Sequence, residues 1–319
     1  MYSPQILHED RGNILFSSPN IEMVLGLLYV GARHKTAEEI LSGLELPNDI
    51  NIIKNGYTAI SSSLKNMNTT VFEVVNKLYI EKTFPVEKEL SLVAEKTFMT
   101  SAENVDFLEN SEELHEAMNS WIEKETNAKI QKLFSQNDST PVSRMVLINA
   151  VYFKGKWKTP FNVSNTCKEP FYVSSTESLQ VDMMHIKETF GYMPLDELNA
   201  QMLVMPYVGD KMCMMILLPN EIDGLHEMEN KLNCVKISQL LDSAYIQQVD
   251  VSLPRFKVEM TIDLQNLLQK IGINSIFDRE TADFANISKE RGLFVSKALQ
   301  KAFIEVSEEG SDTPKAARK

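Results

Sequence analysis

The sequence has little cysteine and no long apolar run, and these two absences exclude several classes of protein. It holds only three cysteines, Cys167, Cys213 and Cys234, among 319 residues. An odd, widely spaced set predicts free thiols rather than a disulfide framework or a metal site. No apolar stretch reaches about 18 residues, so no membrane-spanning helix is expected. The net charge of −12 argues against nucleic acid or an anionic membrane as a partner.

The sequence also lacks the common catalytic motifs, which argues against an enzyme. It contains no Gly-x-Ser-x-Gly, no Cys-x-x-Cys and no Gly-rich phosphate loop. Its histidines show no metal-ligand spacing, and we expect no cofactor and no metal. They are His8, His34, His115, His185 and His226.

The N-terminal half carries mainly helical patterns. Apolar residues from Ile21 to Leu28 keep i, i+3, i+4, i+7 spacing, and those from Leu114 to Ile122 fall on one face. Thr36 and Glu39 have the spacing of a capping box, which predicts that a helix begins at Thr36.

Strand patterns dominate after residue 144. The continuous apolar run Met145–Phe153 predicts a central strand covered on both faces. Residues 249–253 and 256–260 alternate in opposite phases on either side of Pro254, as a bend or an edge position would require. Helices and strands mix without βαβ regularity and no linker interrupts them, so we predict one α+β domain with a large mixed sheet.

The final stretch carries the most specific signal. Ala302, Ile304 and Val306 alternate with polar or larger residues, and the strand runs into Glu308-Glu309-Gly310-Ser311. This resembles the fifth strand of the main sheet and the hinge of the serpin family of protease inhibitors. Further blocks resemble that family in its order along the chain: Asn13–Ser17, Leu28–Arg33, Thr36–Leu41, Asn76–Tyr79, Asn119–Ile122, Thr126–Ile130, Asn149–Trp157, Met205–Tyr207, Ile216–Pro219, Leu253–Phe256 and Ala282–Phe284.

The resemblance implies the serpin fold, with a large mixed main sheet, two smaller sheets and about eight or nine helices. Residues 1–319 would be a single serpin domain that lacks the family's C-terminal strands. We expect those strands as a separate cleaved peptide that remains a partner of this chain. A free loop end is usually poorly ordered, and we therefore expect the cut loop to be inserted in the main sheet.

The resemblance also implies a suicide-substrate mechanism, in which a serine or cysteine protease cuts a mobile loop and the hinge side then inserts as a new strand. The hinge would be Glu308, Glu309, Gly310, Ser311, Asp312 and Thr313. The cut position would lie beyond Lys319 at ordinary loop length, or at Arg318 or Lys319 in a short loop. The region where the sheet opens would include Ser17, Asn20, Asn149, Trp157 and Gln300. Asn20, Asn149 and Gln300 could form a buried amide network, or be ordinary core amides, and Trp157 could equally be a plain core aromatic.

Two residues depart from the small side chains that the family's inhibitors carry in the loop. Pro314 removes one ladder donor, and Lys315 would bring an ammonium group into the sheet. The alternative is therefore a non-inhibitory serpin that acts as a binding, carrier or chaperone protein.

The remaining expectations concern location and surface. We expect a secreted, monomeric glycoprotein. The alternative is a cytoplasmic protein, because the first ten residues show no apolar signal-peptide core. Glycosaminoglycan binding is not expected, since residues 60–66 offer only Lys65. The candidate glycosylation sites are Asn68, Asn137, Asn162 and Asn286.

Overall fold

The structure is a computed structural model that describes residues 12–65, 70–107, 111–130, 132–134, 142–232 and 235–311. Within these residues, no helix is both long and apolar enough to cross a membrane. The described α-helices number eight, in line with the eight or nine expected: α2 (Ser18–Gly31), α3 (His34–Gly43), α4 (Ile50–Lys65), α5 (Lys88–Thr97), α6 (Ser111–Glu125), α7 (Leu225–Leu232), α8 (Ile237–Ser243) and α9 (Leu264–Lys270). Three 3₁₀ turns complete the set: η1 (Val163–Asn165), η2 (Asp196–Leu198) and η3 (Ser275–Phe277).

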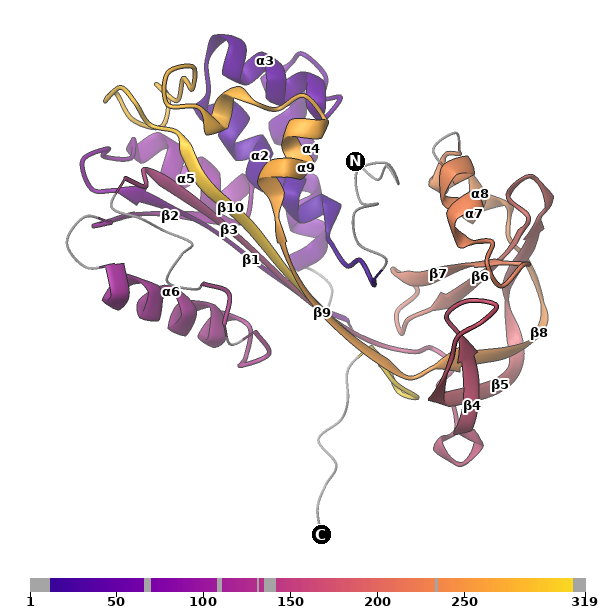
Figure 1. The fold of residues 1–319 in the computed structure, drawn as a ribbon. Helices are drawn as coiled ribbons and strands as arrows, with labels where there is room; N and C mark the ends of the chain where they lie inside the picture. The colour runs from indigo at the N-terminus through magenta and orange to yellow at the C-terminus, as the bar shows by residue number, and fades with distance from the viewer. Residues whose placement is uncertain are drawn as a thin grey trace.

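The main sheet has the strand order β2-β1-β3-β10-β9 (Figure 1). Its strands are β1 (Thr70–Glu81), β2 (Thr100–Val105), β3 (Met145–Lys156), β9 (Phe256–Asp263) and β10 (Val295–Val306). The β1–β2 and β3–β10 pairs are parallel, whereas β1–β3 and β9–β10 are antiparallel. The predicted mixed sheet of an α+β fold is thus confirmed. A two-residue strand, β11 (Gly310–Ser311), pairs with the end of β3.

The second sheet is organised around its longest strand, β5. It consists of β4 (Cys167–Tyr172), β5 (Ser178–Leu195), β6 (Ala200–Pro206), β7 (Cys213–Pro219) and β8 (Tyr245–Pro254). The first part of β5 pairs with β4, its last residues pair with β6, and β8 pairs along its middle. The expected two smaller sheets are therefore joined through β5. The chain passes from this sheet into the main sheet at Pro254, where β8 ends and β9 follows, so the predicted bend there is confirmed.

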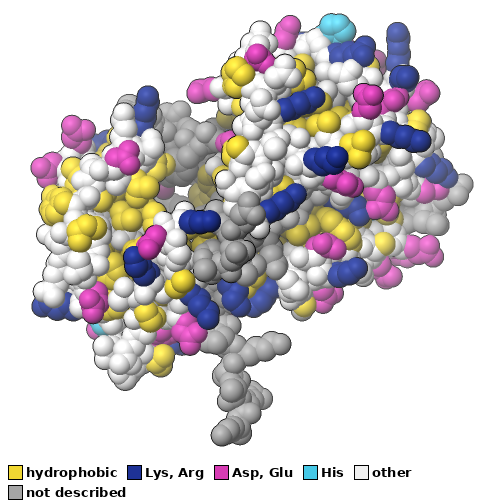
Figure 2. Space-filling model, turned by 180° about the vertical axis from the view of Figure 1, so that it is seen from behind, with side chains coloured by type: hydrophobic (Ala, Val, Ile, Leu, Met, Phe, Trp, Pro, Cys, Tyr) yellow, Lys and Arg dark blue, Asp and Glu magenta, His cyan; other side chains and the backbone are white. Residues whose placement is uncertain are grey.

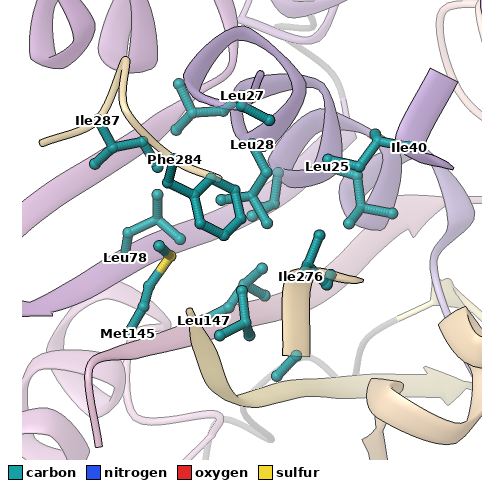
Figure 3. Close-up of a cluster of buried hydrophobic side chains, with 14 of the residues drawn as sticks. Leu25, Leu27, Leu28, Ile40, Leu78, Met145, Leu147, Ile276, Phe284 and Ile287 are labelled. Carbon is teal, nitrogen blue, oxygen red and sulfur yellow. The ribbon is translucent and has the colours of Figure 1, made fainter. Parts of the chain in front are cut away.

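Strand β3 is central because both of its faces are covered. The eight residues Met145–Tyr152 are all buried, as the continuous apolar run predicted. Met145 and Leu147 face the core beneath α2, where Figure 3 shows them near Leu28 and Phe284. The alternate residues, such as Val146 and Ile148, face a second core. Figure 1 shows α6 across that opposite face of the sheet, and its residues Met118 and Ile122 belong to the second core.

The expected insertion of the loop is wrong for this structure. Strands β3 and β10 pair directly with each other from Val295 opposite Met145 to Ile304 opposite Phe153. An inserted loop would lie between these two strands and would interrupt their ladder. The main sheet is therefore in the closed arrangement along this length, and among the described residues Gly310 and Ser311 lie against β3 beyond it.

Charges of both signs cover the surface. Figure 2 shows Lys and Arg side chains interspersed with Asp and Glu side chains over the face it displays.

Candidate functional site at the end of strand β10

The candidate site is a tight chain reversal that follows β10. Ser307 N donates to Gly310 O at 2.8 Å and Gly310 N donates to Ser307 O at 3.2 Å, which closes the turn. We call residues 307–310 the hinge turn. After it, Gly310 lies opposite Lys156 and Ser311 opposite Gly155 on β3. Since β10 leaves β3 at Ile304, the returning chain occupies the edge of β3 that β10 vacates.

The two residues that return along β3 are small because the space there is small. Gly310 has φ +144°, and a Cβ atom at this position would lie 1.9 Å from Gly155 O. A side chain is thus excluded both by the backbone conformation and by the contact with β3. Ser311 is fully buried, and its hydroxyl lies 2.8 Å from the hydroxyl of Tyr207.

Trp157 holds the hinge turn through both of its N–H groups. Its indole Nε1 donates to Ser307 O at 2.9 Å, and its backbone N donates to Glu309 O at 2.9 Å. The ring is buried and stacks on Tyr207 with centroids 4.6 Å apart and planes 9° apart. Burial raises the pKa of Tyr207 to about 12, so its hydroxyl stays protonated beside Ser311. Trp157 is therefore a buried aromatic residue that also holds the hinge turn by two hydrogen bonds.

Glu308 anchors the hinge turn by a buried carboxylate. Its side chain is 6% exposed, accepts from Thr166 Oγ1 at 2.7 Å, and forms an ion pair with Arg255. Burial by itself would raise the pKa of this carboxyl, but the hydrogen bonds from Arg255 and Thr166 outweigh it and hold the pKa below its ordinary value. The backbone oxygen of Glu308 also accepts from Phe161 N at 2.9 Å. The turn is thus tied to the second sheet and to the bend between the sheets.

A row of buried amides crosses the main sheet at its middle. Asn76, Asn149 and Gln300 lie opposite one another on β1, β3 and β10. Gln300 Nε2 donates to Asn149 Oδ1 at 2.6 Å, and Asn149 Nδ2 donates to Asn76 Oδ1 at 2.6 Å. Gln300 also accepts from Ser17 N at 2.7 Å and donates to Ser17 O at 3.1 Å. The row therefore joins three strands to the start of α2.

Asn20 lies outside this row. The alternative in which it joins Asn149 and Gln300 in a buried amide network is therefore wrong. It is fully buried in α2, and neither its Oδ1 nor its Nδ2 has a hydrogen-bond partner among the described residues. Asn76 takes the third place instead, because its register on β1 puts it directly opposite Asn149. The sequence alone does not show this register.

The segment after α6 is also tied to β10. Lys301 is almost fully buried, and its ammonium group donates to Lys132 O at 2.6 Å and pairs with Glu259 at 2.7 Å. The buried cation is therefore satisfied by one carbonyl and one carboxylate. This contact fixes the chain that follows α6 against the sheet next to the amide row.

Several expected site residues fall outside the described part of the chain. These are Asp312, Thr313, Arg318, Lys319, Asn68 and Asn137. Of the remaining glycosylation candidates, Asn162 is exposed and its Oδ1 accepts from Ser164 N at 3.0 Å. The side chain of Asn286 is occupied, since it accepts from Arg33 Nε at 2.8 Å and donates to the carbonyls of Val30 and Ala32.

Sequence reasoning missed the partners that hold the hinge turn. Thr166, Tyr207 and Arg255 come from the second sheet or its borders, and none has a motif of its own. Tyr207 and Arg255 did lie in blocks that resemble the serpin family, but nothing in the spacing indicated that they meet residues more than 50 positions away.

The fold and this site define a class of protein. The family model described as "Serpin (serine protease inhibitor)" matches residues 1–318, and the chain belongs to the serpin family. Human Serpin B11 is 33% identical over 95% of this chain and 82% of its own length. The human leukocyte elastase inhibitor is 30% identical over 96% of this chain and 82% of its own length. The structure of Serpin48 from the insect Tenebrio molitor is 34% identical, with a TM-score of 0.91, over 99% of this chain and 85% of that chain.

Proposed function

We propose that the protein inhibits a protease by the serpin suicide-substrate mechanism and is not itself an enzyme. The observation that carries this proposal is the state of the main sheet. Strands β3 and β10 pair directly, while Gly310 and Ser311 already lie along the vacated end of β3. A loop that continued in this direction would insert between the two strands as a new strand.

Insertion would exchange one type of strand pairing for another. The β3–β10 ladder is parallel, whereas β11 runs antiparallel to β3. A strand continuing from β11 would replace one parallel ladder by two antiparallel ones, which pair slightly more stably per residue. The gain in hydrogen bonds and buried side chains would supply the energy that traps the protease.

Three sets of contacts would hold the sheet closed until the loop is cut. The bond from Gln300 to Asn149 joins β10 to β3 and must break when a strand enters between them. Lys301 ties the segment after α6 to β10. Glu308 holds the hinge turn through Arg255. We propose that Glu308, Glu309, Gly310 and Ser311 are the hinge, and that Ser17, Asn149, Trp157 and Gln300 control the opening of the sheet.

The test is to mix the full-length protein, with its loop intact, with trypsin and separately with papain, and to run a denaturing gel. A band at the summed mass that survives denaturation supports suicide inhibition. Cleavage of the protein, with the protease still fully active, would contradict it.

The loop sequence offers one indication of the target class. If the loop is short, Arg318 or Lys319 is the cut position, and a basic residue there suits a trypsin-like protease with an acidic pocket. Exchanging both residues for Ala should then abolish cleavage by trypsin at this position, and mass spectrometry of the cut protein reports which bond is broken.

A second candidate function is that of a non-inhibitory serpin. Pro314 and Lys315 favour it, because neither suits a strand that inserts in a sheet. In this case the loop is only a substrate, and the gel shows cleavage without a complex.

We also propose that the protein is secreted and glycosylated. Asn162 is exposed and the amide of Asn286 is engaged in three hydrogen bonds, so we expect Asn162 to be the better acceptor of the two. Expression in a secreting eukaryotic cell, followed by glycosidase treatment of wild type and N162Q, checks both points. A protein that stays in the cell unglycosylated would favour the cytoplasmic alternative.

A further inference from the structure

A small cluster of metal-binding side chains lies on the second sheet. Cys167 and Glu169 are two residues apart on β4 and therefore share a face. His185 lies on the neighbouring strand β5. The thiol, the nearer carboxylate oxygen and an imidazole nitrogen all lie within 4.8 Å of one another. No spacing along the chain indicated this cluster, because the strand pairing brings its members together.

The distances within the cluster suit one ion between the three groups. Cys167 Sγ lies 3.4 Å from Glu169 Oε1, and His185 Nε2 lies 3.1 Å from the same oxygen. Zinc binds sulfur at about 2.3 Å and nitrogen or oxygen at about 2.0–2.2 Å in tetrahedral geometry, which places neighbouring ligand atoms about 3.3–3.6 Å apart. The two distances to Glu169 Oε1 are thus close to those between neighbouring ligands of such an ion, and the third pair, thiol and imidazole, lies within 4.8 Å.

The imidazole is oriented for a ligand. His185 Nδ1 lies 3.0 Å from Ser252 Oγ on β8, the residue directly opposite His185 in the sheet. A proton on Nδ1 donated to this hydroxyl leaves the Nε2 lone pair directed at the cluster. The Nε2 atom is buried and makes no hydrogen bond among the described residues, although it is close to the Glu169 carboxylate. Metal-bound histidines characteristically have their other nitrogen held in this way.

The charge and exposure of the cluster also fit a divalent ion. A thiolate and a carboxylate would together neutralise two positive charges, and the imidazole would bind as a neutral ligand. Cys167 is exposed, which leaves a fourth position open to water.

We infer that Cys167, Glu169 and His185 form a zinc-binding site on the second sheet, completed by a water molecule. The mixed sulfur, nitrogen and oxygen set selects zinc over magnesium and calcium, which take oxygen ligands. The site begins one residue after Thr166, whose hydroxyl holds Glu308 in the hinge turn.

The test uses cobalt(II) as a spectroscopic replacement for zinc in the full-length protein. We expect a cobalt–thiolate charge-transfer band and tetrahedral d–d bands that disappear when zinc is added. C167S should abolish the charge-transfer band. C213S is the matched control, because Cys213 lies on β7 outside the cluster, and it should leave the spectrum unchanged.

Two further variants separate ligation from a general effect on folding. H185N should abolish tight zinc binding in competition with a chromophoric chelator. S252A, which removes only the partner of Nδ1, should weaken binding about 10- to 100-fold. Circular dichroism verifies that each variant is folded. No charge-transfer band in the wild type, or equal zinc affinity in wild type, C167S and H185N, would overturn the proposal.

Discussion

Gln300 Nε2 and Asn149 Oδ1 lie 2.6 Å apart in the fully buried middle of the main sheet, across the junction of β10 and β3. This bond joins the two strands that a new strand would have to separate. Its partners are themselves held by Asn76 and Ser17, so the junction is fixed from both sides.

Removal of Asn149 should therefore weaken the closed sheet. N149A leaves the amides of Gln300 and Asn76 short of a partner in a buried place, which costs about 1–3 kcal/mol each in the free energy of unfolding. N20A is the matched control, because the Asn20 side chain makes no hydrogen bond among the described residues and its loss should cost less. Chemical denaturation measures both. If N149A and N20A lowered the free energy of unfolding equally, the hydrogen bonds of the amide row would not contribute to stability.

The ion pair of Glu308 should stabilise the hinge turn. E308Q removes the charge but keeps the shape, and hydrogen bonds to charged groups contribute about 1.5–3 kcal/mol. We expect a lower free energy of unfolding and faster proteolysis at the hinge turn. R255Q should have a similar effect, and the double variant should lose less than the sum of the two. Simple additivity would contradict a coupling between Glu308 and Arg255.

The same carboxylate predicts an acid sensitivity. The pKa of Glu308 is lowered in the folded protein, so its contribution to stability is present above the unfolded pKa of about 4.3 and is lost as the pH falls through the lowered folded value. The difference in unfolding free energy between wild type and E308Q should be constant near neutral pH and shrink below about pH 4.3. A difference that does not depend on pH over this range argues against the charge as its source.

The size of residue 311 should decide between inhibitor and substrate. Ser311 is fully buried against Tyr207, and a larger side chain would keep the chain from lying along β3. S311L should therefore shift the reaction with trypsin from stable complex to cleaved product on a denaturing gel. S311A keeps the size and loses only the hydroxyl contact, so complex formation should persist. Normal complex formation by S311L would refute the role of this position.

The loop residues that depart from the family pattern should limit efficiency. Replacement of Pro314 restores a backbone donor, and replacement of Lys315 removes the need to bury an ammonium group. For P314A/K315A, we expect fewer inhibitor molecules to be cleaved for each protease molecule trapped in the complex. The measurement is the stoichiometry of inhibition, with K289A on the surface of the described chain as the control. An unchanged stoichiometry of inhibition would mean that Pro314 and Lys315 do not limit the efficiency of inhibition.

The elements that the sequence predicted well are those whose burial pattern is continuous. The run at Met145–Tyr152 predicted a strand covered on both faces, and β3 is buried over those eight residues. The change of phase at Pro254 predicted a bend, and there the chain changes sheets.

The predictions that went wrong depend on contacts between distant segments. Thr36 and Glu39 have capping-box spacing, yet α3 begins at His34. The Thr36 hydroxyl accepts from Asp283 N, and Glu39 accepts from the backbone N–H groups of Asn274 and Ser275. Likewise, Asn76 rather than Asn20 completes the amide row because strand register places it there. Local spacing gives no information on such register.

Arg255 follows Pro254 at the point where the chain leaves one sheet for the other, and this position has a mechanical consequence. The Arg255 guanidinium pairs with Glu308 from the border of both sheets. The geometry of this ion pair therefore depends on how the two sheets are aligned. A ligand, partner or mutation that tilts the second sheet would therefore weaken or strengthen the Arg255–Glu308 ion pair without touching the loop. The alignment of the two sheets therefore bears on how firmly the hinge turn is held, although the two sheets meet away from the loop itself.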